Sequence, residues 1–359
     1  MSNSSPLARK KVLHIVSGDM WAGAEAQAHA VLIHLKPVCD VSAVLMNEGE
    51  SSNRLRACEI DVTIFDEATL SSWQIFKLLR AHIQLLKPDI IHTHRQKENI
   101  LGASANFSTV RAKCIRTAHG ASEFTSDWKT KRQRNIERWV TLYLHDVIIS
   151  VSDELKEKLI SDYPAEKVVV VYNGVDIEYL QRNAGISSFK RQQPEKRHIG
   201  IIGRIVPVKR VDIFLEAAAS FKKDNIWNYQ FHIVGDGPLE SQFRSDAMRL
   251  GINDIVTFHG HISDIPSIIN SLDAVVMCSD HEGLPMVALE AWALQTPLLI
   301  TENLDFASAV QGNLVGTPVA HSAAGIANAI FTLPSGPSTS VHPPTAQECA
   351  NKTLEIYLK

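Results

Sequence analysis

Short apolar runs rich in β-branched residues alternate along the chain with longer amphipathic segments, and this alternation occurs twice. The first set of runs lies at residues 12–16, 41–46, 61–65, 89–93, 114–118 and 147–151. The second set lies at residues 198–203, 229–235, 255–260, 274–279 and 297–301. Strands that are apolar throughout are typical of a parallel sheet covered by helices on both faces. The sequence therefore predicts two doubly wound α/β domains.

Two changes of composition interrupt the alternation. Residues 173–197 are rich in polar, Gly, Pro and basic residues, and residues 333–345 are rich in Pro, Gly, Ser and Thr. We therefore expect a first domain at 1–176, a second at 177–335 and a C-terminal segment at 336–359. The chain ends in AQECANKTLEIYLK, which has a helical pattern. Such a helix would join the domains by crossing back onto the first one.

Composition narrows the classes of function. The net charge is −3, with 36 basic and 39 acidic residues. A protein that coats nucleic acid without sequence preference would be strongly positive, so the charge argues against that class. Five widely spaced cysteines without a CxxC pair predict neither a disulfide framework nor a zinc site, and they indicate a reducing compartment. The first apolar run is too short for a signal peptide or a membrane span. We expect a cytoplasmic protein without a nucleic-acid partner, which meets membranes only peripherally.

The stretch HEGLPMVALEA places one carboxylate in a loop and another on the helix after it. Pro285 is expected in the first helical turn, where its missing N–H would be unpaired anyway. At about 1.5 Å per residue, Glu290 lies roughly 7 Å along that helix, while Glu282 precedes it. Both can face one cleft beside a helix N-terminus, an arrangement that suits a nucleotide sugar. The alternative is a helix cap and a solvated glutamate, but the apolar helix favours a binding role for Glu290.

Two cationic side chains follow the first strand of the second domain. Arg204 directly follows the strand, and Lys209 comes shortly before an amphipathic helix. Ligands of open parallel sheets bind outside the carboxyl ends of the strands, so this pair is placed to hold a diphosphate. The alternative is a solvated basic turn paired with Asp212 or Glu216. Lys209 and Arg210 are not both expected to point toward a ligand.

Four motifs in a fixed order resemble those of the family 4 glycosyltransferases, which are retaining enzymes with the GT-B fold. They are GRIVPVKRVDIFLEA, GDGPLE, FHGHISD and SDHEGLPMVALEAWA. Residues 147–176 are similar to the segment that closes the family's first domain, and the likeness covers about residues 12–330. The resemblance implies two Rossmann-like domains facing across a cleft. The first would lie on the acceptor side and the second would bind the nucleotide-sugar donor.

The resemblance also implies roles for individual residues of the second domain. Arg204 and Lys209 would hold the diphosphate of the donor. Glu282 would lie at the donor sugar, and Glu290 at the ribose hydroxyls. The other implied donor-binding positions all lie in loops after strands: Gly235, Gly237, His261, Ile262, Gly283 and Leu284.

In the first domain the resemblance points to a glycine loop and to histidines. Gly23 stands in the loop SGDMWAGAEAQ, preceded by an alanine where relatives commonly carry a second glycine. His119 would be a catalytic residue beside the donor sugar, and His94 and Arg95 would line the acceptor side. His92, His94 and His119 together could also suggest a metal site. No acidic or Cys residue at a familiar spacing completes a ligand set, so we rank a metal site low. We expect no metal and no cofactor besides the donor substrate.

The leading interpretation is a retaining, hexosyltransferase-type enzyme. It would move a sugar from a UDP-sugar, or next in order a GDP-sugar, to a glycan or lipid-linked acceptor in cell-surface polysaccharide or glycoconjugate biosynthesis. No carboxylate pair resembles that of a glycosidase, so we expect front-face attack with protein cations stabilising the departing diphosphate. The sugar, the base, the acceptor and the oligomeric state stay open.

Segment 301–313 lacks a Gly-Gly-x-x-Glu element that many relatives carry near the diphosphate. This departure keeps open an alternative, a weak or inactive nucleotide-sugar-binding homologue that acts with a partner transferase. A nucleotide-sugar epimerase fits the motifs less well. A dinucleotide-dependent dehydrogenase fits worse, because no GxGxxG with a trailing acidic residue follows either first strand.

Segment 126–146 interleaves basic and aromatic residues. It would suit contact with the cytoplasmic face of a membrane or with a lipid-diphosphate acceptor. We favour the other interpretation, a packed helix with a solvated basic face.

Overall fold

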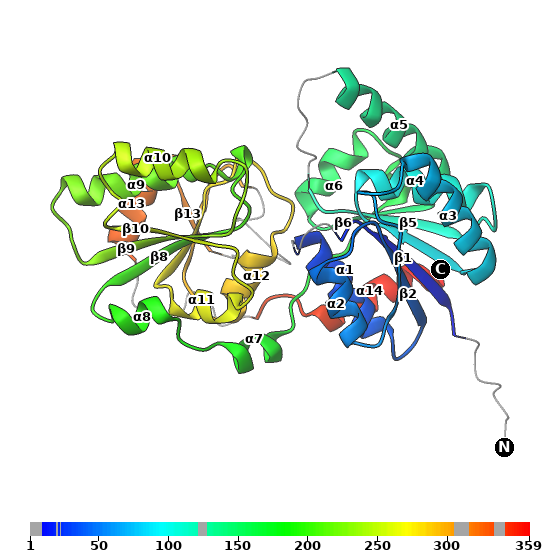
Figure 1. Ribbon diagram of the computed structural model, residues 1–359, viewed down its shortest axis with the longest axis horizontal. Helices are drawn as coiled ribbons and strands as arrows, with labels where there is room; N and C mark the ends of the chain where they lie inside the picture. The colour runs from blue at the N-terminus through cyan, green and yellow to red at the C-terminus, as the bar shows by residue number, and fades with distance from the viewer. Residues whose placement is uncertain (1–8, 19–20, 22, 121–127, 305–315, 334–341) are drawn as a thin grey trace. The chain divides into compact units, whose positions relative to one another are not determined.

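The computed structural model describes residues 9–18, 21, 23–120, 128–304, 316–333 and 342–359, with the side chains of 128–131 outside that description. It divides into two compact units, the first comprising residues 1–174 and 345–359 and the second residues 175–344 (Figure 1). These limits differ from the expected 176/177 and 335/336. The N–H of Val175 donates to the carbonyl of Pro344 at 3.0 Å, so the segments that enter and leave the second unit run together.

The first unit is built on a parallel sheet of seven strands in the order β3-β2-β1-β4-β5-β6-β7. The strands are β1 (Lys11–Val16), β2 (Asp40–Leu45), β3 (Asp61–Ile64), β4 (Ile90–Thr93), β5 (Lys113–Ala118), β6 (Val147–Ser150) and β7 (Val168–Val170). The helices are α1 (Gly23–Leu35), α2 (Glu50–Ala57), α3 (Ser72–Leu86), α4 (Gln96–Phe107), α5 (Trp128–Leu144), α6 (Asp153–Ile160) and α14 (Ala346–Leu358), with a 3₁₀ turn at Ala165–Lys167. Helices α1, α2 and α14 pack together, as do α3, α4 and α5, which gives two helical layers.

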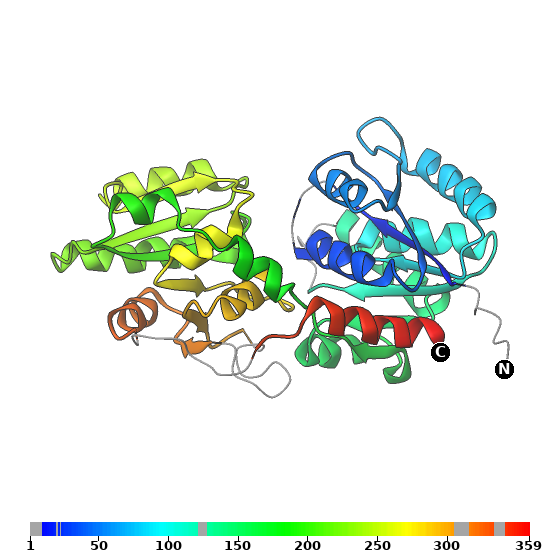
Figure 2. The ribbon, with the colours of Figure 1, turned by 90° about the horizontal axis from the view of Figure 1, so that it is seen from below.

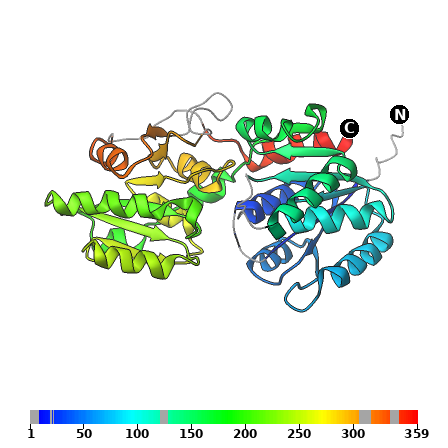
Figure 3. The same cartoon turned by 90° about the horizontal axis from the view of Figure 1, so that it is seen from above.

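The second unit has a parallel sheet of six strands in the order β10-β9-β8-β11-β12-β13. They are β8 (Arg197–Ile202), β9 (Tyr229–Val234), β10 (Val256–Gly260), β11 (Ala274–Met277), β12 (Leu298–Thr301) and β13 (Thr317–Val319). The helices are α7 (Ile177–Asn183), α8 (Ser188–Gln192), α9 (Val211–Lys223), α10 (Glu240–Arg249), α11 (Ile265–Ser271), α12 (Met286–Ala293) and α13 (Ala323–Phe331), with a 3₁₀ turn at Pro207–Lys209. Helices α9, α10 and α13 pack together, and α7, α11 and α12 form a separate group (Figure 3).

Two doubly wound parallel sheets are therefore confirmed, and each predicted run overlaps a strand to within two residues at either end. Strands β7 and β13 were not predicted; they are three-residue strands at the sheet edges. Pro318 lies within β13, and proline is compatible with an edge strand. An edge strand pairs with a neighbour on one side only, so a residue without an N–H can be tolerated there. In each sheet the order turns back on either side of the first strand, so β1 adjoins β4 and β8 adjoins β11. Ligands of such sheets bind at this switch point.

The C-terminal helix α14 completes the first unit. It lies beside α1 (Figure 2) and buries Cys349 and Tyr357 in a core cluster with Val12 and Leu35. A capping box starts it: the Thr345 hydroxyl accepts from the backbone N–H of Glu348, whose carboxylate accepts from the N–H of Thr345. Among the described helices, none is both long and apolar enough to cross a bilayer.

Gly174 should be intolerant of a side chain. A Cβ there would lie 2.1 Å from the carbonyl oxygen of Thr345, at the start of α14. We expect Gly174→Ala to lower the unfolding free energy by about 1–3 kcal/mol, because backbone must shift to relieve the clash. Denaturant unfolding of the full chain measures this. Gly49→Ala, whose Cβ would come no closer than 3.3 Å to its nearest neighbour, is the control; equal losses for both would contradict the packing argument.

Candidate functional site

Glycines let the loops at the carboxyl edge of the second sheet pack tightly. The N–H of Gly203, after β8, donates to the carbonyl of Val234 at 2.9 Å, and the N–H of Gly235 donates to the carbonyl of Gly260 at 2.8 Å. A Cβ on Gly235 would lie 2.1 Å from the oxygen of Gly203, and one on Gly237 would lie 2.3 Å from the oxygen of Ile205. Two predicted donor-binding glycines, Gly235 and Gly237, are thus required by the packing of these loops.

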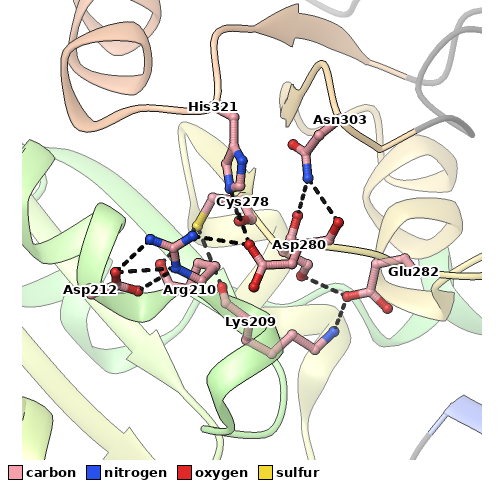
Figure 4. Close-up of polar contacts among 9 residues, drawn as sticks. Lys209, Arg210, Asp212, Cys278, Asp280, Glu282, Asn303 and His321 are labelled. Carbon is pink, nitrogen blue, oxygen red and sulfur yellow. Dashed lines mark hydrogen bonds and ion pairs between the residues drawn. The ribbon is translucent and has the colours of Figure 1, made fainter. Parts of the chain in front are cut away.

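The loops after β8 and β11 are tied together at the switch point. The Lys209 ammonium forms an ion pair with the Glu282 carboxylate, and both side chains are largely buried (Figure 4). The Ser279 hydroxyl donates to the same carboxylate oxygen at 2.7 Å, and the N–H of Asp280 donates to the carbonyl of Val208 at 2.8 Å. The structure therefore brings together two residues that the sequence placed 73 positions apart.

Arg210 is held by the protein. It has a left-handed backbone, with φ of 51°, and its guanidinium donates to both carboxylate oxygens of Asp212 and, at 3.0 Å, to Asp280. These hydrogen bonds, first to Asp212 and then to Asp280, raise its pKa further. The expectation that Lys209 and Arg210 do not both face a ligand agrees with this geometry. The alternative interpretation of this segment was a basic turn paired with Asp212 or Glu216. Arg210 forms such a pair with Asp212.

Two further side chains hold the loop after β11, and the sequence analysis did not identify them. The Asn303 amide donates to the carbonyls of Ser279 and Asp280 at 2.8 and 3.0 Å. His321 donates through Nε2 to the carbonyl of Cys278 at 3.0 Å (Figure 4). Both residues follow later strands, and no motif marks them in the sequence.

Arg204 differs from its basic neighbours. Its side chain is exposed, and its guanidinium has no hydrogen-bond or ion-pair partner within the described part of the chain. It lines a small cavity with Gly203, Lys209 and Val211. Lys209 is neutralised by Glu282, whereas Arg204 has no such partner among the described residues. The positive charge of Arg204 is therefore balanced by solvent or by a ligand.

Helix α12 carries Glu290, but it starts later than predicted. Pro285 has the extended ψ of 136° and caps the helix, so the expectation that it lies in the first turn is wrong. The helix begins at Met286, because ψ at Pro285 is outside the helical range. The Glu290 carboxylate has no partner among the described residues, and burial raises its pKa to about 7.

The remaining predicted positions of the second unit lie in loops. Gly283 and Leu284 are buried between β11 and α12. His261 is exposed and Ile262 is half-buried, directly after β10. Residues 305–313 of the altered segment 301–313 lie outside the described residues.

At the carboxyl edge of the first sheet, His94 and Arg95 follow β4, and Gly23 is the first residue of α1. The Arg95 guanidinium reaches the buried carboxylate of Glu25 at 2.8 Å, so this predicted acceptor residue is bound to α1. His94 Nδ1 lies 3.1 Å from His119 Nε2. Burial lowers the pKa of both imidazoles, that of His94 to about 3, so both are neutral at physiological pH.

Helix α5 is a packed helix with an exposed outer face. Val140 and Thr141 are buried against its neighbours, whereas Trp139 and Tyr143 are 58% and 63% exposed. Arg138 is exposed and pairs with Asp162. The side chains of Trp128, Lys129 and Lys131, which the membrane interpretation also used, lie outside the described ones.

Two family models match consecutive parts of the chain. The model of glycosyltransferase family 4 matches residues 22–179, and that of the glycosyl transferases group 1 matches residues 185–340. The chain belongs to family 4 of the glycosyltransferases. The resemblance of its motifs is thereby confirmed.

Individual relatives agree with this family. The glycosyltransferase is 29% identical over 239 residues to the UDP-Gal:alpha-D-GlcNAc-diphosphoundecaprenol alpha-1,3-galactosyltransferase of Escherichia coli, an alignment that covers 63% of this chain and 60% of that enzyme. It is 29% identical over 227 residues to the capsular polysaccharide biosynthesis glycosyltransferase CapM of Staphylococcus aureus, with 60% and 59% covered. The chain therefore spans about three fifths of the length of these two relatives.

A solved structure shows the fold. HepE of Anabaena in complex with UDP-glucose superposes with a TM-score of 0.78 at 20% identity, covering 90% of this chain and 89% of that one. The expected GT-B fold of the glycosyltransferase is confirmed, since its two Rossmann-like halves match across nearly the whole chain.

The raised pKa of Glu290 should make the stability of the glycosyltransferase depend on pH. The native state holds this proton more tightly than the unfolded chain, whose carboxyl has a pKa of about 4.5. The resulting stabilisation is complete below that value and is lost as the pH rises through about 7. We expect Glu290→Gln to gain roughly 1–3 kcal/mol of unfolding free energy over wild type between pH 5 and pH 8. Denaturant titrations at several pH values measure this, with the exposed Glu216→Gln as control. A pH-independent difference would contradict the raised pKa of this half-buried carboxylate.

Proposed function

We propose that the chain transfers a sugar from a nucleotide-sugar donor, with a UDP-sugar favoured and a GDP-sugar next, to an acceptor used in cell-surface polysaccharide or glycoconjugate biosynthesis. The observation that carries this proposal is the exposed, unpaired guanidinium of Arg204 beside Lys209 at the switch point of the second sheet. The named substrates and roles of the relatives support it: a UDP-Gal-dependent galactosyltransferase, a capsular polysaccharide enzyme and a UDP-glucose complex.

In the proposed complex Arg204 and Lys209 hold the diphosphate. An ammonium has three N–H donors, so Lys209 can keep its bond to Glu282 and still donate to a phosphate oxygen. Arg204 supplies a planar fork that fits two phosphate oxygens. Because these cations offset the diphosphate charge, the proposed reaction uses no metal ion.

The carboxylates bind hydroxyl groups in this proposal. Glu282, fixed by Lys209 and Ser279, accepts from a hydroxyl of the donor sugar. Glu290 accepts from the ribose hydroxyls once ionised, so donor binding lowers its pKa and releases a proton below pH 7.

We propose that transfer occurs with retention of configuration. The bond between the sugar C1 and the diphosphate oxygen breaks, and the acceptor oxygen forms its bond to C1 on the same face. The acceptor proton passes to the departing diphosphate, whose growing charge is stabilised by Arg204 and Lys209. Glu282 is already engaged by a cation and a hydroxyl, which makes it a poor nucleophile. This supports a route without a covalent glycosyl intermediate.

The acceptor in this proposal is a glycan or a lipid-linked sugar that meets the first unit near His94 and Arg95. The exposed Trp139 and Tyr143 of α5 would suit contact with the cytoplasmic face of a membrane, where a lipid-linked acceptor is anchored.

Loss of the Arg204 guanidinium should weaken donor binding and slow transfer. We expect Arg204→Ala to lower kcat/KM for the donor by about 10–1,000-fold, because a fork of charge-assisted hydrogen bonds to the diphosphate is lost. Arg249→Ala is the matched control, since that exposed arginine pairs with Asp246 on α10.

The measurement screens the purified chain against UDP-, GDP-, dTDP-, ADP- and CDP-sugars, with thermal shift and release of nucleoside diphosphate as readouts. Selective stabilisation with release for one donor supports the transferase. Stabilisation without release, even with lipid-linked acceptors present, favours the binding-only homologue. Equal turnover by wild type and Arg204→Ala would contradict the role of Arg204.

A further inference from the structure

Buried histidines run inward from His119 through the first unit. His119 Nε2 lies 3.1 Å from His94 Nδ1, and His94 Nε2 lies 3.0 Å from His14 Nδ1 on β1. The other nitrogen of His119, Nδ1, is buried and has no hydrogen-bond partner among the described residues. One end of this series is therefore a buried imidazole nitrogen whose hydrogen-bonding capacity is not satisfied by the described residues.

The series continues to the C-terminal helix and returns to the sheet. His14 Nε2 lies 3.0 Å from the Tyr357 hydroxyl of α14, and the same hydroxyl lies 2.6 Å from His92 Nδ1 on β4. His92 Nε2 ends the series at the Thr117 hydroxyl of β5, 2.7 Å away. We call these six side chains, from His119 to Thr117, the histidine chain.

The tautomers in the histidine chain are coupled. Burial lowers the pKa of His14, His92, His94 and His119, so each imidazole is neutral and carries one N–H and one lone pair. Each ring bonds a partner through both nitrogens, except at the His119 end. Reversing one bond therefore reverses all of them.

Tyr357 indicates the direction. Its single O–H can donate to only one of its two histidine partners. The contact with His92 is 2.6 Å and the contact with His14 is 3.0 Å. Hydrogen bonds given by a hydroxyl are on average shorter than those given by an N–H. Only one direction assigns the shortest of the three hydroxyl–imidazole contacts to a hydroxyl donor and the contacts at 2.7 and 3.0 Å to N–H donors. In that direction Tyr357 donates to His92, His92 donates to Thr117, and Tyr357 accepts from His14. In that direction His119 donates through Nε2 to His94, and its Nδ1 carries a lone pair.

The open end agrees with this direction. A buried N–H without a partner is rarer in proteins than a buried acceptor without one. We propose that the histidine chain holds His119 in the Nε2–H tautomer, so that Nδ1 is a hydrogen-bond acceptor for a ligand hydroxyl, with Tyr357 as a positioning residue. Under the proposed function, on which the ligand's identity rests, that hydroxyl belongs to a sugar. The tautomer itself does not depend on the function.

A metal ion is the competing occupant. Ring nitrogens of His14, His92 and His94 lie within 4.8 Å of one another, close enough to share an ion. An ion there would need lone pairs that the hydrogen bonds already use. A divalent ion would also bring two positive charges into a buried site whose ligands, three histidines, include no carboxylate or thiolate to balance them. The hydrogen-bonded chain satisfies the same nitrogens at no such cost.

Tyr357→Phe tests the proposal in the full chain. The variant keeps the ring and removes the hydroxyl that accepts from His14. Without that hydroxyl, either direction leaves one buried N–H unpaired, at His14 Nε2 or at His119 Nδ1, so His119 loses its preference for the Nε2–H tautomer. Nitrogen NMR of protein labelled with ¹⁵N-histidine reports which nitrogen is protonated, with His119→Gln for assignment. We expect Nε2–H in wild type and a mixture of the two tautomers in Tyr357→Phe.

Thr353→Val is the matched control, because it removes another buried hydroxyl of α14, which bonds Cys349 and none of the side chains of the histidine chain. It should leave the His119 tautomer unchanged. Thr117→Val, at the far end, should give a mixture of tautomers, because either direction then leaves one N–H unpaired, at His92 Nε2 or at His119 Nδ1. An Nδ1–H in wild type, an unchanged tautomer in Tyr357→Phe, or a stoichiometric metal ion in the purified protein would each overturn the proposal.

Affinity measurements separate this proposal from the function. We expect Tyr357→Phe to weaken UDP-sugar binding about twofold and to leave UDP binding unchanged, because about half of the molecules then lack the lone pair on His119 Nδ1. If the tautomer becomes mixed and the UDP-sugar affinity does not change, the sugar assignment of His119 is overturned while the histidine chain stands. If wild type binds no nucleotide sugar, the function fails and the tautomer result still decides the inference.

Discussion

Parallel strand pairing is the constraint on which the rest of this structure depends. Every strand of a parallel sheet ends at the same edge, and each crossover returns over a face, so the loops after the strands collect side by side. In the second unit this brings the loop after β8 against those after β9 and β11. The approach is close enough that Gly235 and Gly237 cannot carry a side chain without displacing backbone. The edge is consequently a surface of backbone groups with a few charged side chains.

Those charged side chains fall into two kinds. Most of them bind one another: Arg210 holds Asp212 and Asp280, Lys209 holds Glu282, and Arg95 holds Glu25 of α1 in the first unit. These pairs fix the loops, since breaking one leaves a partly buried charge uncompensated. Arg204 and Glu290 have no partner in the described part of the chain. A positive group for phosphate and a carboxylate for hydroxyls are what a nucleotide sugar requires.

Histidines occupy the interior beside both sheets, and their hydrogen bonds end differently. In the second unit His198, His232 and His259 form a ladder that ends on the Gln193 carbonyl, 2.9 Å from His198 Nε2. A carbonyl only accepts, so it fixes the direction of that ladder. In the first unit Tyr357 and Thr117 can both donate and accept, and the direction follows from bond lengths and from the open end at His119. The histidine ladder of the second unit therefore ends on the protein backbone, whereas that of the first unit ends on a nitrogen without a partner among the described residues.

The sequence by itself determined the two parallel sheets, because apolar β-branched runs predict buried strands whatever lies around them. It also determined the family, since the ordered motifs include the residues at the carboxyl edges of the sheets. Short edge strands such as β7 and β13 carried too little periodicity to predict, and a ψ angle at Pro285 moved the start of α12. Only the tertiary structure decided that Arg210 is paired while Arg204 is not, because both are basic residues in one loop. Only folding placed Tyr357 between His14 and His92, since packing brings it there from 343 positions along the chain.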